Sequence, residues 1–200
     1  MSQRPQRFVL VGRDGVRAEL ADFGATLVAL HLPDRAGHLA DVVLGFDDLA
    51  SYGAVDNPWF GAAVGRVANR ITDGRFTLDG STYQLPCNDG RHHLHGGVRG
   101  LSRRAWRVST QTPHAVGFMT ASADGDEGYP GTIEVGVTYT LDGEALTLEY
   151  VATTDRPTPI NLSNHTYWNL AGHAAGPVLD HELWVDAEAF TPTDATVRAR

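Results

Sequence analysis

The sequence contains no lysine: all 16 basic residues are arginine, against 24 acidic residues, which gives a formal net charge of -8. An acidic chain without clustered cations is poorly suited to a phosphate backbone, so nucleic acid is excluded as a partner. The only cysteine, Cys87, excludes an internal disulfide framework. No apolar run approaches the roughly 20 residues of a membrane-spanning helix, and the first residues lack the apolar core of a signal peptide. These absences predict a soluble, cytoplasmic protein without a membrane partner.

Turn residues, by contrast, are plentiful. Asp-Gly pairs recur along the chain, at 14–15, 73–74, 79–80, 89–90, 124–125 and 142–143. Because Asp-Gly supplies the positive φ angles of tight hairpins, this recurrence predicts many short antiparallel strands. Apolar residues occupy every second position of 133–141 and again of 146–150, which predicts one hairpin with a buried and a wet face. A second hairpin is predicted over 75–85, with its turn at 79–80.

Other alternating segments predict further strands, at 8–12, 16–20, 25–32, 41–46, 104–111, 115–122, 158–168 and 181–187. No segment carries a helical apolar stripe over three turns. A length of 200 residues is within the range of one domain. We therefore predict that residues 1–200 form a single all-β domain, an antiparallel β-sandwich.

The segment 161–170, NLSNHTYWNL, concentrates polar side chains. If it is extended, one face carries alternate residues of this segment, namely Asn161, Ser163, His165, Tyr167 and Asn169. A buried strand has no use for such a face, because each polar group would need a partner. A strand that lines a polar cleft does, although a plain exposed sheet face would also accommodate it.

Three histidines crowd the segment 91–97, RHHLHGG. His93 and His95 are two positions apart and would share a face of an extended segment, while Gly96 and Gly97 allow backbone or ligand to come close. A cupin-like metal site is one interpretation, but the carboxylate that should follow within a few residues is missing. An imidazole that transfers a proton or donates to a hydroxyl is another.

Arginine and asparagine are close together in 65–71, GRVANRI, where Arg66, Asn69 and Arg70 could reach an oxygen-rich ligand or could simply be solvated. Three acids in 124–131, DGDEGYPG, lack EF-hand spacing and predict a tight turn that opens the 131–141 strand. Trp59, Trp106 and Trp168 are available for stacking. Together these residue types favour a neutral polyhydroxylated ligand, a small-molecule monosaccharide.

Five ordered motifs resemble the aldose 1-epimerase (galactose mutarotase) family, over about residues 8–194. They are FGAAVGRVANRI at 60–71, FTLDGSTYQLP at 76–86, LHGGVRG at 94–100, DEGYPG at 126–131 and NLSNHTYWNLAGH at 161–173. The resemblance implies a β-sandwich of the galactose-mutarotase type. It also implies interconversion of the α and β anomers of free hexoses, without metal or organic cofactor.

The resemblance implies roles for individual residues as well. His165 would be the general acid that protonates the ring oxygen, and His95 would assist by hydrogen bonding near it. Sugar hydroxyls would be held by a second group of residues, made up of Asn69, Arg70, His95, Thr166 and Tyr167. Histidine suits this chemistry because its pKa lies near neutrality, so it can both give and recover a proton.

The sequence departs from the family pattern at its end. The family's general base is a glutamate that comes after the point where this sequence stops, and the acids at 126 and 127 belong to a different family segment. The last strands of the sandwich are missing too, so we expect unpaired sheet edges and an exposed apolar face. A fragment and a naturally short form both fit. The alternative functions are a non-catalytic sugar-binding relative and an epimerase of phosphorylated hexose.

Overall fold

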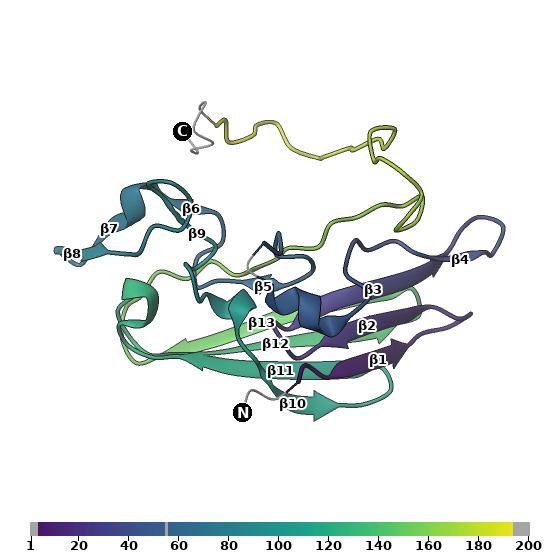
Figure 1. Ribbon diagram of the computed structural model, residues 1–200, viewed down its shortest axis with the longest axis horizontal. Coiled ribbons are helices and arrows are strands. Elements are labelled where there is room, and N and C mark those ends of the chain that lie inside the picture. Colours follow the sequence, from purple (N-terminus) through teal and green to yellow (C-terminus); the bar gives the residue numbers. More distant parts are fainter. Residues whose placement is uncertain (1–3, 55, 194–200) are drawn as a thin grey trace.

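The largest elements of the computed structural model, which describes residues 4–54 and 56–193, are two four-stranded antiparallel sheets (Figure 1). The first sheet follows chain order, with β1 (Arg7–Val11), β2 (Arg17–Ala21), β3 (Thr26–Pro33) and β4 (Leu39–Asp41). The second sheet also follows chain order, with β10 (Arg107–Gln111), β11 (Ala115–Ser122), β12 (Ile133–Asp142) and β13 (Ala145–Thr154). The predicted all-β, antiparallel fold is confirmed.

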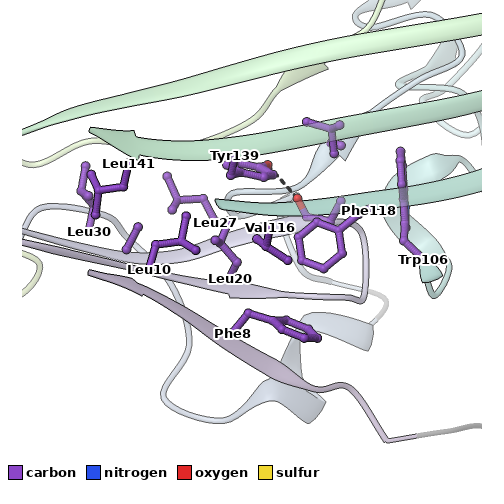
Figure 2. Packing of buried hydrophobic residues seen from close by; sticks show 14 of the residues in the cluster. Phe8, Leu10, Leu20, Leu27, Leu30, Trp106, Val116, Phe118, Tyr139 and Leu141 are labelled. Carbon is purple, nitrogen blue, oxygen red and sulfur yellow. Dashed lines mark hydrogen bonds between the residues drawn. The ribbon is translucent and has the colours of Figure 1, made fainter. Parts of the chain in front are cut away.

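The two sheets pack face to face around a shared apolar core (Figure 2). Phe8 of β1 meets Phe118 of β11 edge to face, with ring centroids 5.4 Å apart. The buried Tyr139 hydroxyl of β12 donates to the Ala25 carbonyl oxygen beside β3, at 2.7 Å. A buried hydroxyl needs such a partner, so this bond both satisfies the tyrosine and ties one sheet to the other.

Both predicted hairpins are confirmed. Strands β12 and β13 pair from Ile133–Thr154 to Asp142–Ala145, and the alternate apolar side chains of β12 are buried. Strands β7 (Arg75–Leu78) and β8 (Ser81–Gln84) pair around Asp79 and Gly80, which both have positive φ. The alternation of apolar residues and the Asp-Gly turn are local signals, so the sequence alone was enough to place these elements.

Short ladders connect the loops beside the sandwich. Strand β5 (Ala63–Val64) pairs with β14 (Ser163–Asn164), and β6 (Arg70–Ile71) pairs with β9 (His93–Leu94). Among the described residues, four 3-10 turns complete the elements, namely η1 (Leu49–Gly53), η2 (Thr72–Gly74), η3 (Leu101–Arg103) and η4 (Asp126–Gly128). The two-residue ladders bring together segments that are far apart in the sequence.

Three predicted strands are wrong in extent or existence. Within 41–46 only Asp41 belongs to a strand, because β4 ends there. Within 158–168 only β14 is a strand, and the residues around it make single backbone bonds to several different loops. The segment 181–187 forms no strand, since no described strand lies alongside to pair with its backbone.

The last described part of the chain, residues 170–193, turns beside β4, where the His173 N–H donates to the Asp41 carbonyl oxygen at 2.6 Å, and then runs above the sheets (Figure 1). It carries large exposed apolar side chains, among them Leu179, Leu183, Trp184 and Phe190, each more than four-fifths exposed. The expected exposed apolar surface is therefore present, but on this segment more than on a sheet face. In the described part of the chain no helix has the length and apolar character needed to cross a membrane.

Candidate functional site

The rings of His95 and His165 lie against each other although they come from distant parts of the sequence. Their centroids are 4.8 Å apart and their planes are nearly perpendicular, at 88°. His95 follows β9 and His165 follows β14, so each side chain leaves the end of a two-residue ladder. Both histidines are partly buried.

His165 is fixed through its backbone and its neighbours. Its N–H donates to the Ala62 carbonyl oxygen at 2.9 Å, and its own carbonyl oxygen accepts from the Gly61 N–H at 3.1 Å. The adjacent Asn164 side chain donates to the Gly61 carbonyl oxygen at 2.9 Å and accepts from the Thr166 N–H at 3.0 Å. Burial lowers the pKa of His165, which makes its protonated form a stronger acid than a solvated imidazolium.

His95 is held by Asn69 on both its backbone and its ring. The His95 N–H donates to the Asn69 carbonyl oxygen at 3.1 Å, and the Asn69 N–H donates to the Nδ1 of His95 at 3.0 Å. Because Nδ1 accepts, the proton of the neutral ring is assigned to Nε2. Burial is the main cause that lowers the pKa of His95 to about 4, and the charges of His165 and Arg70 add to it. At neutral pH His95 is therefore an uncharged Nε2–H donor.

An aromatic wall surrounds the two imidazoles. The ring of Trp59 lies 5.0 Å from that of His95 and 5.9 Å from that of His165, between centroids. The ring of Tyr167 lies 5.1 Å from that of His165, between centroids, and Tyr167 is 39% exposed. The Arg103 guanidinium lies over the Trp59 ring at 5.6 Å. Of the three predicted stacking residues, only Trp59 lies at the histidine pair.

The other two tryptophans lie elsewhere. Trp106 is 3% exposed in the core, where its indole N–H donates to the Leu101 carbonyl oxygen. Trp168 pairs through its backbone with Val43 and is 45% exposed. The sequence does not distinguish the three tryptophans, so only the tertiary contacts show which of them lies at the site.

Asn69 and Arg70 lie at the edge of the histidine pair. Asn69 is exposed and has a positive φ of 65°, and its side-chain oxygen accepts from the Arg70 N–H at 2.8 Å. The Arg70 Nε donates to an Asp89 oxygen at 2.7 Å. Sequence reasoning missed Asp89, because its position beside Arg70 depends on the pairing of β6 with β9.

Two predicted candidates are buried away from the site. Arg66 is 2% exposed, so it does not reach out to a ligand, and its guanidinium donates to Ser122, Ala123, Pro130 and Thr158. His93 is fully buried, with one ring nitrogen 2.7 Å from the Pro86 carbonyl oxygen and the other 2.8 Å from the Tyr129 hydroxyl. These burials correct two expectations, that Arg66 points outward and that His93 shares a face with His95. The left-handed φ of His95 breaks the alternation on which the second one depended.

Asn169 does not belong to the predicted polar face of 161–169. His165 and Tyr167 do lie at the same site, but Asn169 is 1% exposed. Its side-chain nitrogen donates to the Gly176 carbonyl oxygen, and its N–H donates to the Val42 carbonyl oxygen. Only Ser163 and Asn164 form a strand, so side chains do not alternate regularly between two faces beyond them.

Residues 4–54 and 56–193 contain no group of three or more histidine, cysteine or acidic residues that could hold a metal ion. A cavity of about 710 Å³ is lined by Trp59, Asn88, Val98 and Arg103 among others. Trp59 thus contacts the histidine pair and also lines this open space. The region offers imidazole, amide, guanidinium and phenol groups around an aromatic surface, an arrangement suited to an uncharged, hydroxyl-rich ligand.

The family model described as aldose 1-epimerase matches residues 6–199 of the chain. The chain belongs to the aldose 1-epimerase family. Among aldose 1-epimerase relatives, the galactose mutarotase of Sus scrofa is 47% identical over 184 residues, which cover 92% of this chain and 53% of that protein. The aldose 1-epimerase of Escherichia coli (strain K12) is 36% identical over 187 residues, which cover 90% and 52%.

Solved structures of aldose 1-epimerase relatives share the fold. The aldose epimerase homologue from C. elegans superimposes with a TM-score of 0.87 at 36% identity, over 98% of this chain and 59% of that one. The galactose 1-epimerase from Lactobacillus acidophilus gives 0.71 at 31% identity, over 82% and 48%. The predicted galactose-mutarotase type of β-sandwich is confirmed. The chain spans about half the length of the curated relatives it matches.

Proposed function

We propose that this protein interconverts the α and β anomers of a free hexose of the glucose and galactose class, with His95 and His165 at the reacting end of the sugar. The observation that carries the proposal is the contact between the two imidazoles, whose centroids are 4.8 Å apart, beside the ring of Trp59. Family membership supports the same activity. The proposal needs neither metal nor organic cofactor, because proton transfer is sufficient for the reaction.

The proposed reaction begins with opening of the pyranose ring. A base removes the proton of the C1 hydroxyl, the C1–O bond to the ring oxygen breaks, and His165 delivers a proton to that oxygen. The resulting aldehyde rotates about C1–C2, and the reverse transfers close the ring on its other face. His95, as an uncharged Nε2–H donor, would hydrogen-bond near the ring oxygen without competing for the proton.

No residue of this chain is assigned as the base that removes the proton of the C1 hydroxyl. The family resemblance gives that role to a glutamate beyond the matched half of the relatives. Asp89 is close enough for its charge to act on His95, but its carboxylate accepts from Arg70. We therefore assign His165 and His95 to the ring-oxygen side only. A chain without the base should be slower than an intact relative by about 10²- to 10⁴-fold.

The sugar hydroxyls are proposed to contact the rim of the site. Asp89 holds the Arg70 Nε, so the plane of the guanidinium is fixed and its terminal N–H groups can donate to hydroxyl oxygens. The exposed Asn69 and Tyr167 can contact further hydroxyls. Thr166 donates its hydroxyl hydrogen to the Asn164 side-chain oxygen, which leaves its oxygen as an acceptor.

A monosaccharide fits this site better than a phosphorylated hexose does. Of the three arginines considered for a phosphate, Arg66 is buried, while the positive charges of Arg70 and Arg99 are already balanced by Asp89 and by the Glu127 carboxylate, 3.8 Å from Arg99. The one cysteine, Cys87, is free and exposed, which suits a reducing compartment, and we propose a cytoplasmic location on that ground.

Polarimetry on freshly dissolved α-glucose and α-galactose tests the proposal. The chain should accelerate mutarotation over buffer, and His165→Ala should lower that acceleration by about 10²-fold or more. His38→Ala is the matched control, because His38 is a largely exposed histidine in the turn between β3 and β4.

Saturable sugar binding without any acceleration, measured by calorimetry, would instead favour the non-catalytic sugar-binding relative. Equal rates for His165→Ala and His38→Ala would remove the catalytic assignment of His165.

A further inference from the structure

The segment 95–100, which follows β9, is here called the His95 loop, and its backbone is unusual. His95, Gly96 and Gly97 have consecutive positive φ angles of 52°, 84° and 96°. Only glycine adopts this region without cost, so His95 must be held there by its surroundings. On the N-terminal side the two bonds with Asn69 do this. A separate set of contacts must hold the C-terminal side.

Glu127 makes that second set of contacts. Its side chain is only 7% exposed, and its two carboxylate oxygens accept from consecutive amides of the loop, Val98 N–H at 3.0 Å and Arg99 N–H at 3.0 Å. The same carboxylate lies so close to Gly97 that a Cβ added at Gly97 would overlap Oε2. Bonds from backbone amides to a charged carboxylate are stronger than neutral ones, so this one side chain restrains three successive loop residues.

The neighbouring acid binds an arginine that contacts two carbonyl oxygens of the loop. An oxygen of Asp126 accepts from Arg104 at 2.9 Å and from the Ser122 hydroxyl at 2.6 Å. Arg104 in turn donates to the carbonyl oxygens of Arg99 and Gly100. The turn η4 thus binds the amide hydrogens of the loop directly and its carbonyl oxygens through one arginine.

We propose that Glu127 is a positioning residue for His95: it fixes the C-terminal side of the His95 loop so that the imidazole stays against His165 with Nδ1 on the Asn69 amide. The catalytic meaning of this role rests on the proposed function. Both oxygens of Glu127 are occupied by loop amides, so it acts on the reaction through His95 and not on the sugar.

The test uses Glu127→Gln, in which the new NH₂ group faces amide hydrogens that need an acceptor. The matched control is Asp124→Asn, an acid three positions earlier whose oxygen accepts from the Gly131 N–H and pairs with Arg156, away from the loop. One readout is the ¹⁵N shifts of the His95 ring, which report its tautomer. The others are hydrogen exchange of the Val98 and Arg99 amides and the kinetics of mutarotation.

In Glu127→Gln we expect His95 to become a mixture of tautomers, the two amides to exchange at least tenfold faster, and kcat to fall about tenfold with a smaller change in KM. Asp124→Asn should change none of these. A wild-type His95 spectrum in Glu127→Gln would overturn the proposal. If that variant does not fold, Glu127→Asp, which keeps the charge but is one methylene shorter, should show the same changes in milder form. A changed spectrum in a protein with no mutarotase activity would reject the proposed function and still support the positioning role.

Discussion

Replacement of Arg66 by methionine should destabilise the protein strongly, although the sequence offered this arginine as a ligand contact. Methionine fills a similar elongated space but donates no hydrogen bond. In the native protein Nε donates to the Ser122 hydroxyl at 3.0 Å, one terminal nitrogen donates to the Pro130 carbonyl oxygen at 2.9 Å, and the other donates to the Ala123 carbonyl oxygen at 2.8 Å. The guanidinium also lies 5.5 Å over the Tyr129 ring.

The expected loss follows from what the substitution leaves behind. With Arg66 2% exposed, water cannot replace its donors, so the carbonyl oxygens of Ser122, Ala123 and Pro130 would each lose a charged partner inside the protein. The carboxylate of Asp126, whose charge favours the protonated arginine, would lose a nearby cation as well. Breaking such a buried charged network costs about 3–5 kcal/mol, out of the roughly 5–15 kcal/mol by which a domain is stable.

Urea unfolding followed by tryptophan fluorescence measures this loss. With a slope of about 2–3 kcal/mol per molar urea, the midpoint of Arg66→Met should fall by about 1–2.5 M. Arg91→Met is the control, because the Arg91 side chain is 71% exposed and pairs only with Asp73 in the bonds described, so it should stay within about 0.5 kcal/mol of the wild type. Equal midpoints for the two variants would refute the assignment of Arg66 to the internal framework.

Two further predictions concern the His95 loop. Burial lowers the pKa of His95 from 6.5 to about 4, so as pH falls the unfolded chain takes up this proton first. The contribution of neutral His95 to the free energy of unfolding is thus fully present above pH 6.5. It is lost between pH 6.5 and 4, by about 1–2 kcal/mol once the partial exposure of the ring is allowed for. His95→Gln should lack this loss, so parallel curves of unfolding free energy against pH for the wild type and His95→Gln would contradict the prediction. Gly96→Ala should destabilise by at least about 2 kcal/mol more than Gly37→Ala, because both have φ near 85° but only at Gly96 would a Cβ overlap a neighbour, the Gly65 carbonyl oxygen. Similar unfolding midpoints for the two variants would show that the loop can shift to make room.

The hairpins and the core were predictable because their signals are local. Apolar residues alternate along β12, and the side chains at those positions are buried against the first sheet. Asp79 and Gly80 supply the positive φ angles of the β7–β8 turn. The segment 181–187 was predicted to be a strand but is not one. Alternation of apolar residues specifies which side chains share a face, but it cannot supply the partner strand that the backbone hydrogen bonds need.

The candidate site was predictable as a set of residue types more than as a geometry. His95 and His165 were singled out and do meet, whereas His93, two positions from His95, is sealed against Tyr129. The left-handed φ of His95 makes this separation, and the two bonds of His95 with Asn69, a residue 26 positions away, accompany it.

The sequence by itself determined the all-β architecture, the two hairpins and the histidine-bearing segments, because the period-two pattern and the turn residues act over a few neighbouring positions. Tertiary structure alone decided which imidazole faces His165, which tryptophan joins it, and which arginine is buried. These outcomes depend on pairings such as β5 with β14 and β6 with β9, two residues long and closed across many intervening positions. Such short ladders leave almost no periodic signal, so only the packed chain reveals them.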